Sequence, residues 1–243
     1  MKEIIKVNRL TKCYAGRPAV NKLELTVERG TIFGLLGANG AGKSTTIECI
    51  LGTKKADEGK VTILGMNPYT DRKSLFERVG VQFQESSYQE KITVRELCEV
   101  TESLYRETED SFELLKKFKI DDKKKSLVKD LSGGERQRLF IVLALIGKPD
   151  VVFLDELTTG LDAKARREVW KMLSALKEKG LTIFLTSHFM DEVEALCDKI
   201  CILKKGNAVF KGTVSDAVKD SPFDNLEDAY LWYTEEEEKN ENI

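Results

Sequence analysis

Residues 37–44 have the composition and spacing of a loop that binds phosphate groups. They read GANGAGKS and match the pattern G-x-x-x-x-G-K-[ST] at every fixed position. Glycine lets a backbone fold closely around a phosphate, where a Cβ atom would clash, and successive N–H groups then point inward at the anion. Lys43 would supply a mobile positive charge for the β- and γ-phosphates, and Ser44 a hydroxyl group for Mg²⁺. The loop alone predicts a nucleotide binder and not a particular enzyme.

The segments on either side of this loop favour that prediction over a glycine-rich turn that matches by accident. Residues 31–36 form an apolar run bounded by glycines, which predicts a buried strand, and residues 43–51 predict a helix that ends before Gly52. The start of this helix would add the positive end of its dipole to the anion site. The residues expected to contact the nucleotide here are Gly37, Asn39, Gly40, Ala41, Gly42, Lys43, Ser44 and Thr45.

A second chemical feature is the pair of carboxylates at positions 155 and 156. The continuous apolar run of residues 151–154 predicts a central strand covered on both faces, and it leads directly into Asp155 and Glu156. Adjacent side chains leave a strand in different directions, so one can serve a metal and the other a water molecule. Asp155 is expected to hold Mg²⁺ through water, and Glu156 to polarise the attacking water. An exposed acidic turn is the alternative.

Residues 131–135 read LSGGE and have the features of a helix start. Ser132 is expected to cap the helix, and Glu135 stands three residues on, as in a capping box. Two glycines in the first turn reduce helix stability, which makes sense if another group must approach that backbone closely. An anion at the helix N-terminus is the natural candidate. A capped helix without further function is the alternative.

The same residues resemble the signature motif of ABC (ATP-binding cassette) ATPases. The phosphate loop, the signature and the acidic pair stand in that family's order, and the resemblance covers residues 4–212. It implies an ATPase that uses ATP and Mg²⁺. It further implies that two cassettes pair head to tail, so that each ATP lies between one phosphate loop and the partner's signature. Ser132 and Gly134 would then contact the γ-phosphate held by the other subunit.

Further residues stand at positions that match the family. Tyr14 resembles the aromatic residue that stacks on adenine, and a buried core tyrosine is the alternative. Gln84 resembles the glutamine that reaches Mg²⁺ and the attacking water, with Gln82 as the neighbouring alternative. Asp162 resembles the D-loop aspartate at the dimer seam. His188, the only histidine, follows a predicted strand and resembles the histidine that bonds the γ-phosphate.

The resemblance therefore implies two sets of residues that act in catalysis. The expected catalytic set is Glu156, His188, Gln84 and Lys43, and the expected Mg²⁺ set is Ser44, Gln84 and Asp155. Two positions depart from the family. Leu157 stands where proline is usual, and Glu135 stands where glutamine is common. Neither change removes a chemical group, so we expect an active enzyme.

Alternating strands and helices predict an α/β fold with a largely parallel sheet. The resemblance implies a P-loop NTPase: a RecA-like core, a small antiparallel part at the N-terminus and an inserted α-helical subdomain. Short strand-like runs stand at residues 4–7, 23–27 and 61–64. The predicted division is an ATP-binding core of residues 1–84 and 147–220, a helical subdomain of residues 85–146 that carries the signature, and a C-terminal helix and acidic tail of residues 221–243.

Composition and hydropathy limit the partners and the cell compartment expected for this chain. The formal net charge of −2 over 243 residues gives no basic field for nucleic acid. No apolar run reaches the roughly 18 residues that span a bilayer, and the first residues lack the apolar part of a signal peptide, so we expect a cytoplasmic protein. Cys197 and Cys201 are four residues apart and would share a face if helical. With one histidine in the chain, reduced thiols are favoured over a metal site.

Without an internal repeat, the chain is expected to be a single cassette that works with separate subunits. The leading hypothesis is the ATPase subunit of an ABC transporter, peripheral on the cytoplasmic face of the membrane. Its partners would be a second cassette, identical or different, and an integral membrane permease. Residues 187–198 and 226–231 resemble the multidrug and lipid exporter branch, which favours export. The alternative is a non-transport ABC ATPase of the iron–sulfur assembly type.

Overall fold

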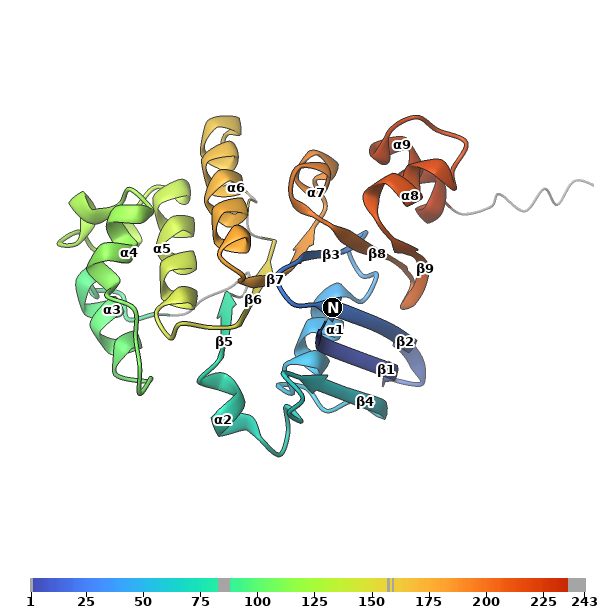
Figure 1. The fold of residues 1–243 in the computed structure, drawn as a ribbon, viewed down its shortest axis with the longest axis horizontal. Helices are drawn as coiled ribbons and strands as arrows, with labels where there is room; N and C mark the ends of the chain where they lie inside the picture. Colours follow the sequence, from blue (N-terminus) through green and yellow to red (C-terminus); the bar gives the residue numbers. More distant parts are fainter. Residues whose placement is uncertain (1, 83–87, 157, 159, 236–243) are drawn as a thin grey trace, which may run out of the picture.

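The computed structural model describes residues 2–82, 88–156, 158 and 160–235. Two β-sheets and a set of helices make up the described chain (Figure 1). Gln84 and Leu157, two positions singled out in the sequence, lie outside the described residues. Every helix in the described ranges is too short or too polar to cross a membrane.

The main sheet has six strands in the order β5-β6-β7-β3-β8-β9, and all neighbours are parallel except β8 and β9. The strands are β3 (Ile32–Gly37), β5 (Val79–Gln82), β6 (Val151–Asp155), β7 (Thr182–Ser187), β8 (Lys199–Lys204) and β9 (Asn207–Gly212). Every residue of β3, β6 and β7 is buried, as expected for central strands with both faces covered. Because these three strands are parallel, their carboxyl ends lie at the same edge of the sheet.

The smaller sheet is antiparallel, with the order β2-β1-β4. Its strands β1 (Glu3–Tyr14) and β2 (Arg17–Glu28) are much longer than the apolar runs predicted at residues 4–7 and 23–27, and β4 spans Glu58–Ile63. Polar residues fill the exposed positions and the register shifts between Val7 and Leu10, so alternation is broken. Periodicity alone therefore underestimates both strands.

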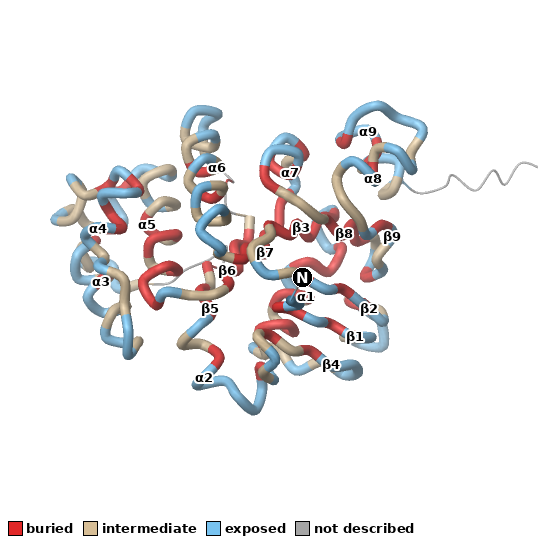
Figure 2. The backbone as a smooth tube through the Cα atoms, in the orientation of Figure 1, coloured by how far each residue is buried: buried red, intermediate tan, exposed pale blue. Residues whose placement is uncertain are grey.

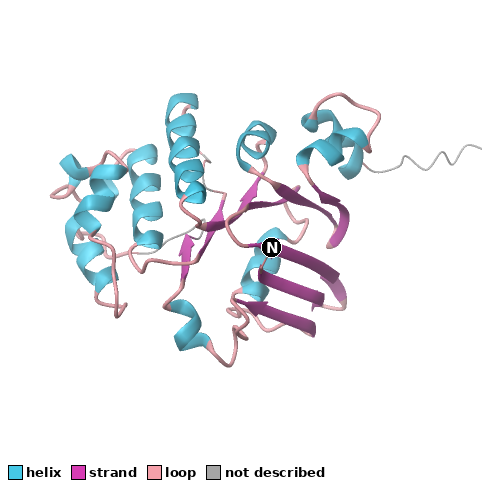
Figure 3. Ribbon diagram, in the orientation of Figure 1, coloured by secondary structure: helices cyan, strands magenta, loops and turns pink. Residues whose placement is uncertain are grey.

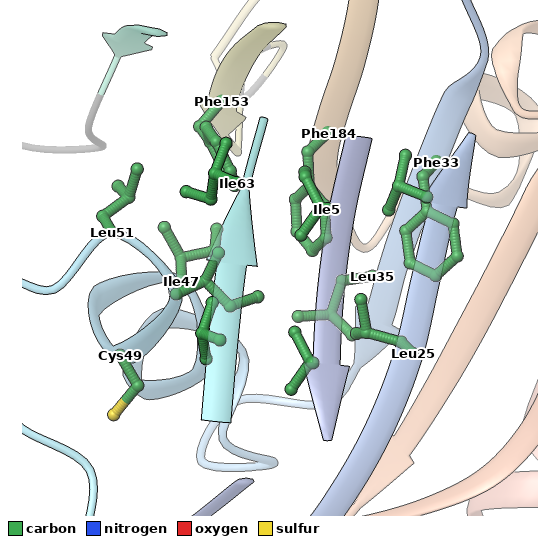
Figure 4. Packing of buried hydrophobic residues seen from close by; sticks show 14 of the residues in the cluster. Ile5, Leu25, Phe33, Leu35, Ile47, Cys49, Leu51, Ile63, Phe153 and Phe184 are labelled. Atoms are coloured by element: carbon green, nitrogen blue, oxygen red, sulfur yellow. The ribbon is translucent and has the colours of Figure 1, made fainter. Parts of the chain in front are cut away.

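The two sheets share a hydrophobic core around helix α1 (Lys43–Ile50). Figure 4 shows Ile5 and Ile63 of the smaller sheet facing a row of aromatic rings from the main sheet. The ring centroids of Phe33 and Phe184 lie 5.4 Å apart, and those of Phe153 and Phe184 lie 5.2 Å apart. Burial of each such side chain contributes about 1.5–3 kcal/mol. This packing fixes β3, β6 and β7 relative to α1, which follows the phosphate loop.

The opposite face of the main sheet is covered by α6 (Ala163–Glu178) and α7 (Met190–Leu196) (Figure 1). Helices α3 (Val94–Glu102), α4 (Ser111–Lys117) and α5 (Gly133–Leu145) gather at the β5 end. Two 3₁₀ turns, Asp121–Lys123 and Val128–Asp130, join α4 to α5. The tube in Figure 2 shows buried residues concentrated where these helices face the sheet.

Three short helices complete the described chain: α2 (Arg72–Phe76), α8 (Val214–Lys219) and α9 (Leu226–Thr234). The last of these lies within residues 221–243, where a C-terminal helix is predicted. It packs on the β8–β9 hairpin, where the ring centroids of Phe210 and Tyr233 lie 5.1 Å apart. The sequence did not predict the β8–β9 hairpin. Figure 3 shows the elements by type, with mixed α/β character that confirms the predicted fold class.

Gly80 in β5 is a tight contact between the main sheet and α5. A Cβ atom added there would lie 2.0 Å from the carbonyl oxygen of Ala144. Overpacking of this kind costs about 1–3 kcal/mol or more, so Gly80→Ala should lower the free energy of unfolding measured in urea by at least that amount. Gly134→Ala is the control, because that position is helical and a Cβ atom there would meet no described atom closer than 3.6 Å, so it should not lose stability. Equal stability of Gly80→Ala and the unmodified chain would contradict the prediction.

Candidate nucleotide site

The phosphate loop connects β3 to α1, and two of its glycines are required by the chain's own packing. Gly42 has a φ of +105°, and a Cβ atom there would lie 2.2 Å from the carbonyl oxygen of Ala19 in β2. At Gly37 it would lie 2.7 Å from the carbonyl oxygen of Leu203. Gly40, by contrast, has no atom within 4 Å of a built Cβ. The loop is thus held against β2 and β8 on one side and open on the other.

The open side carries the remaining loop residues expected to meet a nucleotide. Ala38, Asn39 and Gly40 are exposed, as is Ser44 in the first turn of α1, whereas Ala41 is buried and Thr45 half-buried. The first turn of α1 holds no acidic residue that would compete for its N–H groups. An anion on this side therefore meets free donors and the positive end of the helix dipole.

Lys43 is the buried cation of the site. Its side chain is 5% exposed, and Nζ donates to the carbonyl oxygens of Gly37 at 2.8 Å and Ala38 at 3.4 Å. Burial lowers the pKa of Lys43, while the nearby Glu156 and Asp155 carboxylates raise it. The lysine ammonium therefore lies inside the loop, beside the acidic pair.

Asp155 ends β6 as a buried carboxylate, so the alternative of an exposed acidic turn is wrong. It is 6% exposed and accepts a hydrogen bond from the hydroxyl of Thr186, its cross-strand neighbour in β7. Burial raises the pKa of Asp155, the Thr186 hydrogen bond lowers it, and the Glu156 charge raises it. Sequence reasoning missed Thr186. Its only signal was a hydroxyl residue inside an apolar strand.

Glu156 leaves the strand in a left-handed conformation, with φ of +49°. Such a conformation is uncommon for a non-glycine residue and is found in strained functional segments. Its N–H donates to the Thr186 hydroxyl at 2.9 Å. Its Oε1 lies 4.0 Å from Nζ of Lys43 and 4.0 Å from Nδ1 of His188. The turn thus directs Glu156 away from the path of Asp155 and toward the phosphate loop.

His188 follows β7 directly. Its side chain is 41% exposed, and its ring packs on Phe189 with centroids 4.2 Å apart. The structure therefore brings together four of the predicted side chains at the carboxyl edge of β3, β6 and β7, namely Lys43, Asp155, Glu156 and His188. Ligands of open parallel sheets bind at this edge.

Tyr14 ends β1 at the hairpin beside the loop. It is 44% exposed, so the alternative of a buried core tyrosine is wrong. The Nζ atoms of Lys54 and Lys12 lie 5.3 Å and 5.7 Å from its ring centroid. Ala19 of the same hairpin touches Gly42 of the loop. An exposed ring is therefore available in the part of the smaller sheet that contacts the phosphate loop.

The signature segment has the capping box that its sequence predicts. The Ser132 N–H donates to Oε2 of Glu135 at 2.8 Å, and the Glu135 N–H donates to the Ser132 hydroxyl at 3.3 Å. These hydrogen bonds hold the pKa of Glu135 below its usual range, helped by Lys123 at 3.2 Å. The glutamate that departs from the family pattern is therefore accommodated by its own helix.

The two signature glycines are not required by packing within the chain. A Cβ atom at Gly133 would have only the Gly160 carbonyl oxygen nearby, at 3.6 Å, and one at Gly134 would approach no atom closer than the Ala165 Cβ at 3.6 Å. These are ordinary contacts, unlike those at Gly42. Ser132 and Gly133 are also exposed. The missing side chains therefore leave this helix tip open to an outside group.

Asp162 caps α6 and accepts hydrogen bonds from the N–H groups of Lys164 at 2.9 Å and Ala165 at 2.8 Å. It is exposed beside the signature helix tip. Gln82, the alternative to Gln84, is buried in β5. The hypothetical helix face of Cys197 and Cys201 is wrong, because Cys197 ends α7 and Cys201 lies on β8. All five cysteines are free thiols, and the described residues hold no group of three metal-ligating side chains.

A glycine loop between a buried parallel strand and a helix, next to an acidic strand end, defines a P-loop NTPase. A family model described as "ABC transporter" matches residues 20–159. The chain therefore belongs to the ABC transporter family.

Curated relatives include the Nod factor export ATP-binding protein I of Rhizobium meliloti (strain 1021). It is 41% identical over 214 residues, which are 86% of this chain and 64% of that protein. The protein of the same name from Burkholderia lata is 37% identical over 86% of this chain and 70% of its own length. The chain thus spans slightly less than two thirds of the Rhizobium meliloti protein.

Solved structures show the same architecture. The chain superposes on an ATP-binding subunit of an ABC transporter with a TM-score of 0.87, 27% identity and coverage of 96% of this chain and 100% of that one. A dimeric bacterial ABC transporter cassette matches with a TM-score of 0.78, 25% identity and coverage of 86% and 98%. The chain therefore has the fold of an ABC cassette.

Proposed function

We propose that this chain is the ATP-hydrolysing subunit of an ABC exporter. The observation that carries the proposal is the position of the Glu156 carboxylate, 4.0 Å from both Lys43 and His188 at the mouth of the phosphate loop. A base at this place can orient a water molecule toward a γ-phosphate that Lys43 and His188 stabilise. Hydrolysis needs little more from the protein than positioning and charge neutralisation.

The oxygen atoms beside the phosphate loop also fit Mg²⁺, an ion that prefers oxygen ligands and keeps several bound waters. Ser44 offers an exposed hydroxyl, and the buried Asp155 carboxylate is held by Thr186. When bound, the ion would neutralise charge on the phosphates. Gln84 is proposed to reach the same region from the segment after β5. Asp155 is oriented by the hydrogen bond that it accepts from the Thr186 hydroxyl.

Head-to-tail pairing of two cassettes is the proposed active assembly. The open signature tip at Ser132, Gly133 and Gly134 supports it, since the described residues leave room for a Cβ atom at both glycines. The dimeric cassette among the structural relatives also supports it. Asp162, exposed beside that tip, would lie at the seam between the subunits.

Export through a separate permease is the proposed work of this ATPase. The relatives from Rhizobium meliloti and Burkholderia lata are ATP-binding proteins of Nod factor export, which supports transport over the iron–sulfur assembly alternative. The permease is proposed to contact the region of residues 84–95 at the cytoplasmic face of the membrane, beside the helical subdomain of residues 85–146. Residues 1–84 and 147–220 would form the ATP-binding core, with residues 221–243 as a C-terminal extension.

Two measurements test the proposal. The purified chain should hydrolyse ATP in the presence of Mg²⁺. An affinity-tagged chain, isolated from detergent-solubilised membranes of its native cell, should bring with it a polytopic membrane protein that mass spectrometry identifies. ATPase activity without any membrane partner would retain the enzyme and reject the transporter role.

Replacement of Tyr14 tests nucleotide binding separately. Loss of a ring that stacks on a base costs roughly 1–3 kcal/mol, so Tyr14→Ala should raise the Kd for ATP about 5- to 150-fold. Tyr14→Phe keeps the ring and should bind ATP like the unmodified chain. Fluorescent-nucleotide displacement measures both variants. An unchanged Kd for Tyr14→Ala would remove the residue from the site.

A further inference from the structure

Glu192 is a buried carboxyl group that the proposed reaction has not used. It lies on α7, is 1% exposed, and accepts a hydrogen bond from the indole N–H of Trp170 at 3.1 Å. Burial raises the pKa of Glu192, whereas the neighbouring polar groups of Ser187, Thr158 and Trp170 lower it. A carboxyl group is expensive to bury without such partners, so its surroundings are built around it.

The partners of Glu192 come from segments that flank the reacting groups. Thr158 stands two residues after Glu156, and Ser187 immediately precedes His188; both are nearly fully buried. Trp170 lies on α6, the helix that Asp162 caps. The Glu192 carboxylate thus accepts a hydrogen bond from the middle of α6 and lies near the buried hydroxyl groups of Thr158 and Ser187.

Each contact continues toward the nucleotide site. The Ser187 hydroxyl accepts the Phe189 N–H at 3.0 Å, and the Phe189 ring packs on His188. On α6, the helix that carries Trp170, the Cβ atom of Ala165 lies 3.6 Å from the Cβ position of Gly134 in the signature. Glu192 is therefore joined by short contacts to the segments that carry His188 and the helix tip.

We propose that Glu192 is a positioning residue, which holds α6, capped by Asp162, and the His188 segment in the arrangement needed for hydrolysis. The proposal rests on the ATPase function proposed above. Glu192 touches no substrate and acts through the residues that surround it. A residue of this kind affects the rate of the reaction more than the binding of nucleotide, because the phosphate loop that binds ATP lies on other elements.

Glu192→Ala tests the proposal. Small misplacements of reacting groups reduce rates by up to about 100-fold, so kcat for ATP hydrolysis should fall about 10- to 100-fold while KM for ATP stays close to that of the unmodified chain. Glu192→Gln keeps an acceptor oxygen for the indole N–H and should restore most of the lost kcat. Rates are expressed per bound fluorescent nucleotide, so that misfolded material does not count.

Glu194→Ala is the matched control, because Glu194 lies on the same helix but is exposed. It should retain full kcat. Trp170→Phe removes the indole donor from α6 and should lower kcat less than Glu192→Ala, with effects that do not add in the double variant. Equal kcat for Glu192→Ala and Glu194→Ala would overturn the proposal. No hydrolysis by the unmodified chain would instead reject the proposed function.

Discussion

Replacing Glu156 with glutamine should lower the rate of ATP hydrolysis about 10²- to 10⁴-fold, the usual contribution of a positioned general base. Glutamine has nearly the same volume and keeps an oxygen near Lys43 and His188, but it cannot take up a proton from water. The Lys43 ammonium and the phosphate loop are unchanged, so ATP binding should remain. Removal of a negative charge 4.0 Å from Lys43 should favour binding of the ATP phosphates.

Single-turnover hydrolysis and equilibrium binding of ATP separate these two effects. Glu178→Gln makes the same chemical change on the exposed end of α6 and should hydrolyse ATP like the unmodified chain. Near-normal turnover by Glu156→Gln would remove Glu156 from the role of base. Loss of ATP binding together with turnover would show instead that the left-handed turn at residue 156 had changed shape.

The phosphate loop and the acidic strand end were predictable from sequence because each depends on residues next to one another in the chain. Lys43 and Ser44 begin a helix that follows a glycine loop, and Asp155 ends a continuous apolar strand. Local patterns of this kind carry their own structural context. The capping box of Ser132 and Glu135 was predictable for the same reason, since both partners lie within one helical turn.

Thr186 and Glu192 could not be found in this way. Thr186 contacts Asp155 only because β6 and β7 pair in a register that places residue 155 opposite residue 186. Glu192 meets Trp170 only after α6 and α7 have packed together on the sheet. In the sequence each is an unremarkable polar residue. Contacts between distant segments depend on strand order and helix packing, which periodicity does not specify.

The phosphate-loop glycines show that a correct motif can have a structural reason that the sequence does not reveal. The sequence explained them by close approach of a phosphate, yet Gly37 and Gly42 are needed because backbone of β8 and β2 lies against them. The signature glycines have the opposite character, since the chain itself leaves room for a side chain at Gly134. Two glycine motifs with similar sequence signals thus serve different purposes, and only the structure separates them.

That difference allows a direct test of head-to-tail pairing. Gly134→Asp should fold normally, because its Cβ meets nothing closer than 3.6 Å and an acidic residue suits the first turn of a helix. It would nevertheless place a carboxylate where the partner's γ-phosphate is proposed to lie. Lys43→Ala should also be inactive, because it removes the positive charge of the phosphate loop. Each variant alone should therefore hydrolyse ATP very slowly.

A mixture of the two variants should recover activity. In a mixed dimer, the intact loop of the Gly134→Asp subunit faces the intact signature of the Lys43→Ala subunit, which gives one complete site. If half of the dimers are mixed and each has one of two sites, the mixture should reach about a quarter of normal activity in a symmetric head-to-tail pair. Without recovery, two copies of this chain would not complete each other's sites, and the partner cassette would have to be a different chain. The open tip at Ser132 and Gly133 would then face the phosphate loop of that other cassette.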